Sequence, residues 1–387
     1  MKNKITAYLR PEGEVGIRNH ILVMASVVCA NKAVSMIGKN ENNVVSITHP
    51  HGCDQAGEDR ERTLRTLAGV ASNPNVAGVI IVGLGCETIS AEMIAEKISA
   101  TEKPVYALEI QNNGGVSSTV EEGKRILKGL KDKASKVKRG KVGIDQLVVG
   151  LECGGSDAFS GITANPAVGV ASDLIVENQG SVILSETPEF IGAEHLLIER
   201  CSDSKVKEKL AFIVQRFEQK AKDTGLDIRG ANPTPGNMAG GITTLEEKSL
   251  GCIYKGGTSE VKEVIEYAEK PNKKGLIIMD TPGNDVESMT GMAAGGAQIM
   301  IFTTGRGTPT ACAVAPTIKV ATNSLIYENM KESMDINAGE IITGHKSIAE
   351  VGEEILDLLI EVAEGRLTRG EILDQRDFAI NRIGPTF

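Results

Sequence analysis

The chain has 387 residues, of which 41% are hydrophobic and 24% are charged, so it is long enough for two or three domains with large apolar cores. A net charge of -9, with 3% aromatic residues and no Trp, argues against general binding to nucleic acid. The longest apolar stretch, residues 21–30, is too short to cross a bilayer and residues 1–16 are polar, so we expect a cytoplasmic protein with reduced thiols and no membrane partner.

Between residues 21 and 130, apolar β-branched runs alternate with segments of helical spacing. Strands are predicted at 21–28, 44–48, 78–82 and 105–110, and helices at 30–37, 58–71, 90–99 and 117–130. This alternation predicts an α/β fold with a Rossmann-like, mostly parallel sheet. The basic run at 124–141 predicts the end of an exposed helix and then a linker, so we place the first domain at residues 1–140.

A second, larger α/β domain is expected over residues 141–387. Its strands are predicted at 147–150, 181–184, 275–279 and 299–302, and its helices at 193–199, 205–224, 259–268 and 348–364. The loops between them are rich in Gly, Pro, Asn and Thr, and long loops of this kind are usually functional.

Five of the seven cysteines follow a short apolar run and lie in a glycine-rich or polar turn. Strands of a parallel sheet end at one edge, where ligands bind, so thiolates gathered there would form a metal site. We expect Cys53, Cys86 and Cys153 to hold the metal, with Cys29 and Cys312 in reserve. Any one of them alone would be read as a buried, inert thiol. Because there is no CxxC pair, we do not expect a closed zinc knuckle. We interpret the two remaining cysteines, Cys201 and Cys252, as structural.

Two polar turns in the first domain could bind a metal or move protons. The first places His49, His51 and Cys53 in one turn after a predicted strand, although it is also typical of a helix cap. The second places Cys86 and Glu87 after a glycine turn, where the N-terminus of a helix favours a thiolate.

The second domain carries candidates for anion binding and for general base catalysis. Arg306 lies between two glycines and suits bidentate capture of a carboxylate, or is a surface Arg in a glycine turn. Glu186 and Glu189 follow a predicted strand, as a general base would, although acids also decorate helix N-termini. Neither GxGxxG nor a Walker A motif is present, so nucleotide binding has no support.

Several of these motifs, in order and across nearly the whole chain, resemble the altronate and galactarate dehydratase family. They are residues 16–19, 49–53, 83–87, 153–157, 161–166, 185–189, 232–237, 280–283 and 303–307. The resemblance implies an iron-dependent lyase that takes an α-proton from a small acidic 2-hydroxy carboxylate and expels a β leaving group, which gives a 2-keto acid. The large subunit of (2R)-3-sulfolactate sulfo-lyase resembles the same pattern, with sulfite as the leaving group. A non-catalytic iron-binding subunit or sensor is the alternative of another class.

The chemistry of such an elimination, which needs a Lewis acid, a cation and a base, assigns roles to single residues. Iron, as Fe2+ or an iron–sulfur cluster, would polarise the substrate, Arg306 would hold its charge, and Glu186, His51 or His49 would act as the base. Glu87 or Asp157 would give the leaving group a proton. Further substrate contacts are expected from residues in the same motifs, namely Asn165, Asn237 and Thr304.

One departure concerns partners. Sugar-acid dehydratases of this family commonly begin with a small SAF domain, whereas this sequence starts directly at the main body. We therefore expect either a separate small SAF-domain subunit or its loss, and we expect an oligomer.

Overall fold

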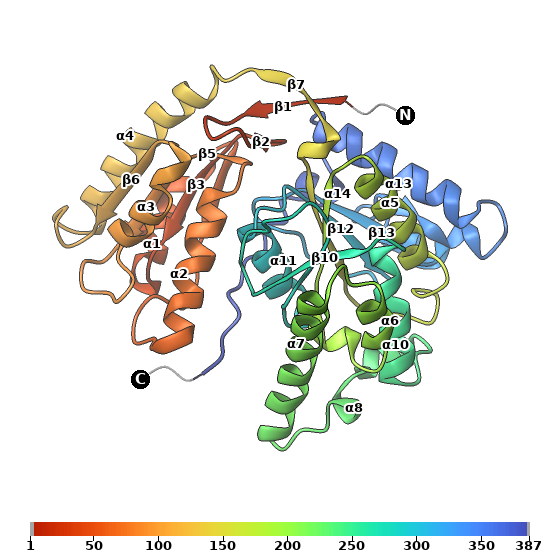
Figure 1. Cartoon of the computed structure of the whole chain (residues 1–387). Coiled ribbons are helices and arrows are strands. Elements are labelled where there is room, and N and C mark those ends of the chain that lie inside the picture. Colours follow the sequence, from red (N-terminus) through yellow and green to blue (C-terminus); the bar gives the residue numbers. More distant parts are fainter. Residues whose placement is uncertain (1–3, 385–387) are drawn as a thin grey trace.

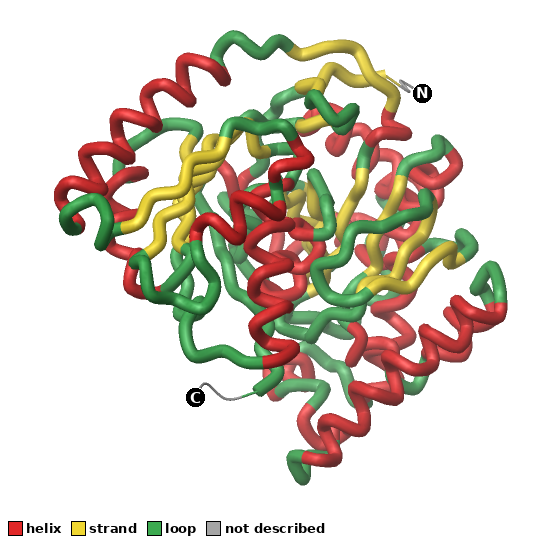
Figure 2. Tube along the Cα trace, turned by 60° about the vertical axis from the view of Figure 1, so that its left-hand side comes forward, coloured by secondary structure: helices red, strands yellow, loops and turns green. Residues whose placement is uncertain are grey.

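The computed structural model describes residues 4–384 and contains two parallel sheets side by side, each covered by helices (Figures 1 and 2). This confirms the α/β class and the mostly parallel sheets expected from the sequence. A small antiparallel sheet lies over one end of both (Figure 1).

The smaller parallel sheet has four strands in the order β4-β3-β5-β6. The strands are β3 (His20–Ala25), β4 (Val44–Ile47), β5 (Val76–Gly83) and β6 (Val105–Glu109). Helices α1 (Asn31–Gly38) and α4 (Val116–Ala134) pack on one face, and α2 (Gly57–Ser72) and α3 (Ala91–Lys97) pack on the other. All eight elements lie within a few residues of the predicted ranges, because each strand is a continuous apolar run and each helix has one apolar face.

The larger sheet has seven strands, all parallel, in the order β10-β11-β9-β8-β12-β13-β14. They are β8 (Val148–Cys153), β9 (Ser181–Leu184), β10 (Val261–Ile265), β11 (Gly275–Met279), β12 (Ile299–Thr304), β13 (Thr317–Ala321) and β14 (Ile336–Asn337). Helices α5 (Ala164–Glu177) and α13 (Ile348–Ala363) pack against each other on one face. On the other face α11 (Asp285–Ala294) packs against α2 and so joins the two units.

The remaining helices surround the loops that leave the large sheet. They are α6 (Glu194–Glu199), α7 (Ser204–Asp223), α8 (Ile228–Ala231), α9 (Pro235–Ala239), α10 (Leu245–Ile253), α12 (Ser324–Asn329) and α14 (Arg369–Ile372). None of the helices within residues 4–384 has both the length and the apolar character needed to cross a membrane.

The predicted helix at 259–268 is wrong, because this segment forms the edge strand β10. Its polar residues suggest a helical period, yet Val261, Val264 and Ile265 are buried where the strand pairs with β11. The β-branched side chains favour the pleated surface, and packing decides between the two periods.

The small sheet is inserted between strands of the antiparallel sheet. Strand β1 (Lys4–Leu9) pairs with both β2 (Val15–Gly16) and β7 (Arg139–Gly143), and residues 20–134 lie between β2 and β7 in the chain. Ile5, Ala7 and Ile17 belong to the core of the large unit. The basic run predicted as a linker therefore includes a strand, and the proposed division at residue 140 falls inside β7.

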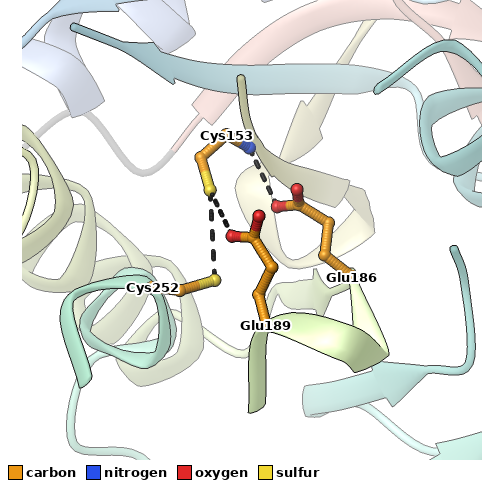
Figure 3. A group of neighbouring side chains, drawn as sticks. All are labelled: Cys153, Glu186, Glu189 and Cys252. Atoms are coloured by element: carbon orange, nitrogen blue, oxygen red, sulfur yellow. Dashed lines mark hydrogen bonds between the residues drawn. The ribbon is translucent and has the colours of Figure 1, made fainter. Parts of the chain in front are cut away.

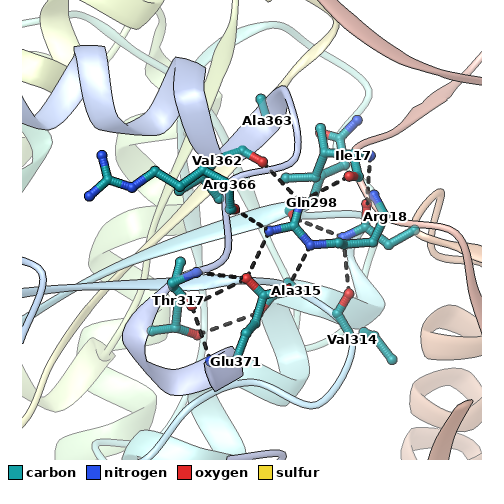
Figure 4. A network of polar contacts seen from close by, with 12 residues as sticks. Ile17, Arg18, Gln298, Val314, Ala315, Thr317, Val362, Ala363, Arg366 and Glu371 are labelled. Atoms are coloured by element: carbon teal, nitrogen blue, oxygen red, sulfur yellow. Dashed lines mark hydrogen bonds and ion pairs between the residues drawn. The ribbon is translucent and has the colours of Figure 1, made fainter. Parts of the chain in front are cut away.

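Two buried polar residues tie the units together. The guanidinium of Arg18 donates to the carbonyl oxygens of Ile17, Val362 and Arg366 and forms an ion pair with Glu371 (Figure 4). The amide of Asn75 accepts from the backbone N–H groups of residues 17 and 18 and donates to the carbonyls of residues 298 and 314. Together they hold the amino edges of the two sheets together.

Candidate active site at the end of strand β8

Two thiols and two carboxylates meet at the carboxyl end of β8, in the interior of the large unit (Figure 3). Cys153 ends β8, Glu186 and Glu189 follow β9, and Cys252 lies in α10. The Cys153 thiol donates to Oε2 of Glu189 at 3.0 Å, and its Sγ lies 4.0 Å from that of Cys252. The backbone N–H of Cys153 donates to Oε2 of Glu186 at 2.9 Å. All four residues are buried.

Two lysines neutralise the two carboxylates. Lys255 Nζ lies 2.7 Å from Oε2 of Glu186, and Lys248 forms an ion pair with Glu189. Burial alone would lower the pKa of Lys255, but the thiols of Cys153 and Cys252 and the carboxylates raise it well above its usual range. The ammonium is therefore charged at neutral pH. Each buried carboxylate has a lysine as its partner, so neither charge is left unpaired away from solvent.

A third carboxyl group of this network, that of Glu152, is protonated. Glu152 is fully buried, and burial followed by the charge of Glu186 raises its pKa well above the ordinary value. Neither Oε1 of Glu152 nor Oε1 of Glu186 has a hydrogen-bond partner among the described residues. Two neighbouring buried carboxyl groups cannot both ionise, so Glu152 stays protonated and can donate to Glu186.

The donor set of Cys153, Glu186, Glu189 and Cys252 could hold a metal ion. One ligand atom from each residue lies within 4.8 Å of all the others. Thiolates with carboxylates suit iron or zinc, and two protons lost by the thiols would offset the charge of a divalent cation. Lys255 Nζ lies 3.2 Å from Sγ of Cys252, so its ammonium must move aside if all four residues bind one ion.

The loop after β8 presents two consecutive glycines beside this cluster. A Cβ on Gly154 would lie 2.1 Å from Oδ2 of Asp285, at the start of α11. A Cβ on Gly155, whose φ is +61°, would lie 3.0 Å from Cβ of Arg306. The loop thus needs glycine at both positions, because side chains would displace Asp285 and Arg306. Arg306 is exposed and has no acidic partner among residues 4–384.

The other residues expected in the large unit lie around the same loops and hold them in place. Oδ1 of Asp157 accepts from Ser160 and Thr322, and its Oδ2 accepts from Asn323. Asn165 accepts from the hydroxyl of Thr303 and donates to the carbonyl of Gly251. Asn237 donates to the carbonyl of Ser156, and the hydroxyl of Thr304 accepts from the N–H groups of residues 307 and 308.

The candidates of the small unit meet at the carboxyl edge of its own sheet. Nε2 of His49 lies 2.8 Å from the carbonyl of Ala25, and its Nδ1 accepts from the backbone N–H of His51. Burial lowers the pKa of His49 to about 4, and burial with nearby Arg382 lowers that of His51. Both imidazoles are therefore neutral at neutral pH.

The thiols of this edge are more accessible than the β8 cluster. Cys29 and Cys86 are exposed and Cys53 is half-buried. Burial and the carboxylate of Asp54 raise the pKa of Cys53, and Cys86 acts on it from nearby. Glu87 accepts from the hydroxyl of Ser26 and from the backbone N–H groups of residues 84–86.

The structure does not gather the five expected cysteines into one ligand set. Within the described residues, Cys53 and Cys86 share no set of mutually close donors with Cys153. The backbone N–H of Cys312 donates to the hydroxyl of Thr317 at the beginning of β13. This is the opposite end of the sheet from Cys153. The cause is topological, because the chain crosses the whole sheet between Thr304 and Cys312.

Sequence reasoning missed several residues of the cluster. Cys252, interpreted as structural, lies beside Cys153, and Lys248 and Lys255 were not considered. A signal for these three was present, because intervals of four and three residues place them along one side of a helix and its 3-10 extension. Asp285 and Lys319 had no comparable signal.

Two family models together match nearly the whole chain. Residues 144–386 match the family model described as D-galactarate/altronate dehydratase, C-terminal. Residues 7–135 match the model described as D-galactarate dehydratase/altronate hydrolase, second domain.

Relatives of known activity extend the comparison. An altronate dehydratase of Bacillus subtilis is 38% identical over 390 residues, which cover 98% of this chain and 78% of the relative. The beta subunit of (2R)-sulfolactate sulfo-lyase from Chromohalobacter salexigens is 34% identical, covering 97% of this chain and 96% of the relative. A galactarate dehydratase (L-threo-forming) of Escherichia coli is 38% identical over 310 residues, covering 78% of this chain and 59% of the relative.

Proposed function

Because the chain belongs to the D-galactarate/altronate dehydratase family, as its sequence motifs predicted, we propose that this lyase dehydrates a small sugar acid. In this reaction the α-proton of a 2-hydroxy carboxylate is removed and the β-hydroxyl leaves as water, and the resulting enol becomes a 2-keto acid. The observation that carries the proposal is that the loop after β8 lies between a buried thiol–carboxylate cluster and Arg306, which has no acidic partner among the described residues.

Iron is the proposed cofactor. Cys153, Glu186, Glu189 and Cys252 would hold it, and a mixed set of thiols and carboxylates supports a single ferrous ion over a thiolate-bound iron–sulfur cluster. When bound, the ion would supply a Lewis acid for the substrate oxygens. A cluster on Cys53, Cys86 and Cys153 stays the alternative, and it would require thiols from both sheets to meet.

Arg306 is the proposed group that binds the substrate carboxylate. Its side chain is exposed beside Gly155, and guanidinium groups bind carboxylates in a bidentate manner. Asn165, Asn237 and Thr304 would shape the site by fixing its loops. Glu186, His51 and His49 stay the candidate bases.

Of these bases, Glu186 lies in the same loop cluster as Arg306, since it accepts from the N–H of Cys153. A base must reach the α-proton of a substrate whose carboxylate is held by Arg306. The two histidines lie at the edge of the small unit instead, beside the C-terminal segment of the chain. The ring centroids of His49 and Phe378 are 6.4 Å apart. Position therefore favours Glu186, in which case Cys153, Glu189 and Cys252 would be left to hold the iron.

Release of sulfite from sulfolactate is the second candidate reaction. The sulfo-lyase beta subunit aligns over 96% of its own length, which supports it. In that case we propose a small SAF-domain subunit as partner, and in either case an oligomer of this chain.

The test is a substrate screen under anaerobic conditions. The chain, loaded with ferrous iron, is incubated with D-altronate, galactarate and (2R)-3-sulfolactate, with and without a small SAF-type subunit. We expect 2-keto acid, measured as its semicarbazone, and sulfite is assayed separately to identify the leaving group. Iron-loaded protein that forms no 2-keto acid in any mixture would contradict the lyase proposal and favour a non-catalytic iron-binding subunit or sensor.

A further inference from the structure

Asp285 and Arg306 lie on either side of the same glycine pair. Oδ2 of Asp285 packs against Gly154, and Cβ of Arg306 packs against Gly155. Two backbone hydrogen bonds fix this loop to β12, from the N–H of Gly154 to the carbonyl of Thr303 and from the N–H of Gly305 to the carbonyl of Gly155. Asp285 is only partly buried, and it lies beside the same glycine pair as Arg306.

A buried lysine lies behind Asp285. Glu152, Phe302 and Lys319 are paired across β8, β12 and β13, and their side chains form a row on the face that α11 covers. Nζ of Lys319 lies 3.3 Å from the centroid of the Phe302 ring and makes no hydrogen bond with any described residue. A fully buried amine without a hydrogen-bond partner is costly, which indicates a role other than stability.

The electrostatics of Asp285 suit a group that gives up a proton. Burial, then the charges of Glu186 and Glu189, raise its pKa to about 7, while Lys319 acts in the opposite direction. The carboxyl group is therefore protonated in a large fraction of molecules at neutral pH. A catalytic acid works best when its pKa lies close to the working pH.

We propose that Asp285 is the general acid of this site and protonates the departing β-hydroxyl, with Lys319 as the positioning residue behind it. The proposal rests on the lyase function proposed above. As a base takes the α-proton, the carbon–carbon double bond forms and the β carbon–oxygen bond breaks. The electron pair of that bond stays on the oxygen, which takes the proton of Asp285 and leaves as water. The Asp285 carboxylate then regains a proton from solvent.

The two acids suggested by the sequence are less available for this step. Both oxygens of Asp157 accept hydrogen bonds from neighbouring loops. Both oxygens of Glu87 accept backbone N–H groups, which lower its pKa although burial would raise it. Hydrogen bonds to a carboxylate favour its ionised form, so Glu87 is not the proton donor, and both oxygens of Asp157 are already occupied by loop contacts.

The test replaces the acid and changes the leaving group. Asp285→Asn in the iron-loaded full chain is assayed with D-altronate and with an analogue whose 3-hydroxyl is replaced by chloride, which leaves without a proton. We expect turnover of altronate to fall about 100-fold or more, while turnover of the chloro analogue stays near that of the parent protein. Exchange of the α-proton with solvent deuterium should persist, because the base is intact. Glu287→Gln, in the same turn of α11, is the matched control and should leave both activities unchanged.

Three results would overturn the proposal. They are parent-like turnover of altronate by Asp285→Asn, an equal loss on both substrates, and loss of α-proton exchange. Failure of the unmodified protein on altronate and on the analogue would instead contradict the lyase function. As a second measurement, the Asp285 carboxyl carbon, assigned by its loss in Asp285→Asn, should titrate near pH 7 in a 13C spectrum, and titration near pH 4 would also overturn the proposal.

Discussion

Nζ of Lys255 lies 2.7 Å from Oε2 of Glu186, and both side chains are completely removed from solvent. The contact places a charge pair at the point where β8, β9 and α10 meet. Each charge is expensive to bury, so each depends on the other. Glu186 therefore serves both stability and the proposed chemistry.

We expect Lys255→Met to destabilise the protein by about 3–5 kcal/mol, because it leaves the Glu186 carboxylate buried without its partner. The measurement is the free energy of unfolding in urea at pH 7. The double variant Lys255→Met with Glu186→Gln should recover part of the loss, since no unpaired charge remains. A double variant as unstable as the sum of the two single variants would show that the pair is not coupled.

Iron content distinguishes the two proposed ligand sets. Cys153→Ser and Cys252→Ser should each lower the iron bound after anaerobic loading if the metal lies at β8. Cys201→Ser removes a buried thiol outside the set and is the matched control. Loss of iron in Cys53→Ser and Cys86→Ser, with normal binding in Cys252→Ser, would favour the cluster that spans both sheets.

We expect Lys319→Met to stabilise the protein at pH 7, by up to about 4 kcal/mol. Burial lowers the pKa of Lys319 from 10.5 to about 7, although nearby carboxyl groups act in the opposite direction. These groups are Asp285, Glu152, Asp335 and Asp377. Between pH 7 and 10.5 the unfolded chain binds more protons at this lysine than the folded chain, so its contribution to stability rises with pH.

In Lys319→Met that rise should disappear. The measurement is the free energy of unfolding in urea from pH 7 to 9.5, with Lys220→Met at an exposed position of α7 as a comparison. A variant less stable than the parent at pH 7 would show that Lys319 is a structural cation.

Removing the amide of Asn75 should weaken the joint between the two units. We expect Asn75→Ala to cost about 3–4 kcal/mol, because it leaves buried N–H and C=O groups without partners on both sides of the joint. Asn42→Ala, at an exposed position of the same unit, should change the stability by less than about 0.5 kcal/mol. Equal stability of the two variants, measured by thermal unfolding, would contradict this role.

Most of the two sheets could be predicted from the sequence, because continuous apolar runs and regular helical spacing report burial directly. Strands 181–184 and 275–279 have the predicted bounds. The exceptions include β10, β13 and β14 of the large sheet and β7 of the antiparallel sheet, none of which was predicted as a strand. Strand β7 forms from a basic segment because β1 pairs with it, and β10 forms because β11 offers an edge.

The candidate site was only partly predictable, for a related reason. Cys153 and Glu186 follow strands, so their place at the sheet edge follows from topology. Cys252 and Lys255 reach the site from a helix, and only the folding of a long connection determines where that helix lies. The separation of Cys312 from Cys153 has the same origin, since a loop that recrosses the sheet has no periodic signal.

The insertion of residues 20–134 between β2 and β7 gives the small unit two attachments to the rest of the chain. Both attachments lie in one antiparallel sheet, and Arg18 adds a third tie to the helical C-terminal region. A lobe with a single tether can swivel in any direction, whereas one held by paired strands is restricted to bending about the line that joins them. Any opening between the carboxyl edges of the two sheets would have to be a bend of this kind about β2 and β7, and it would have to separate α2 from α11.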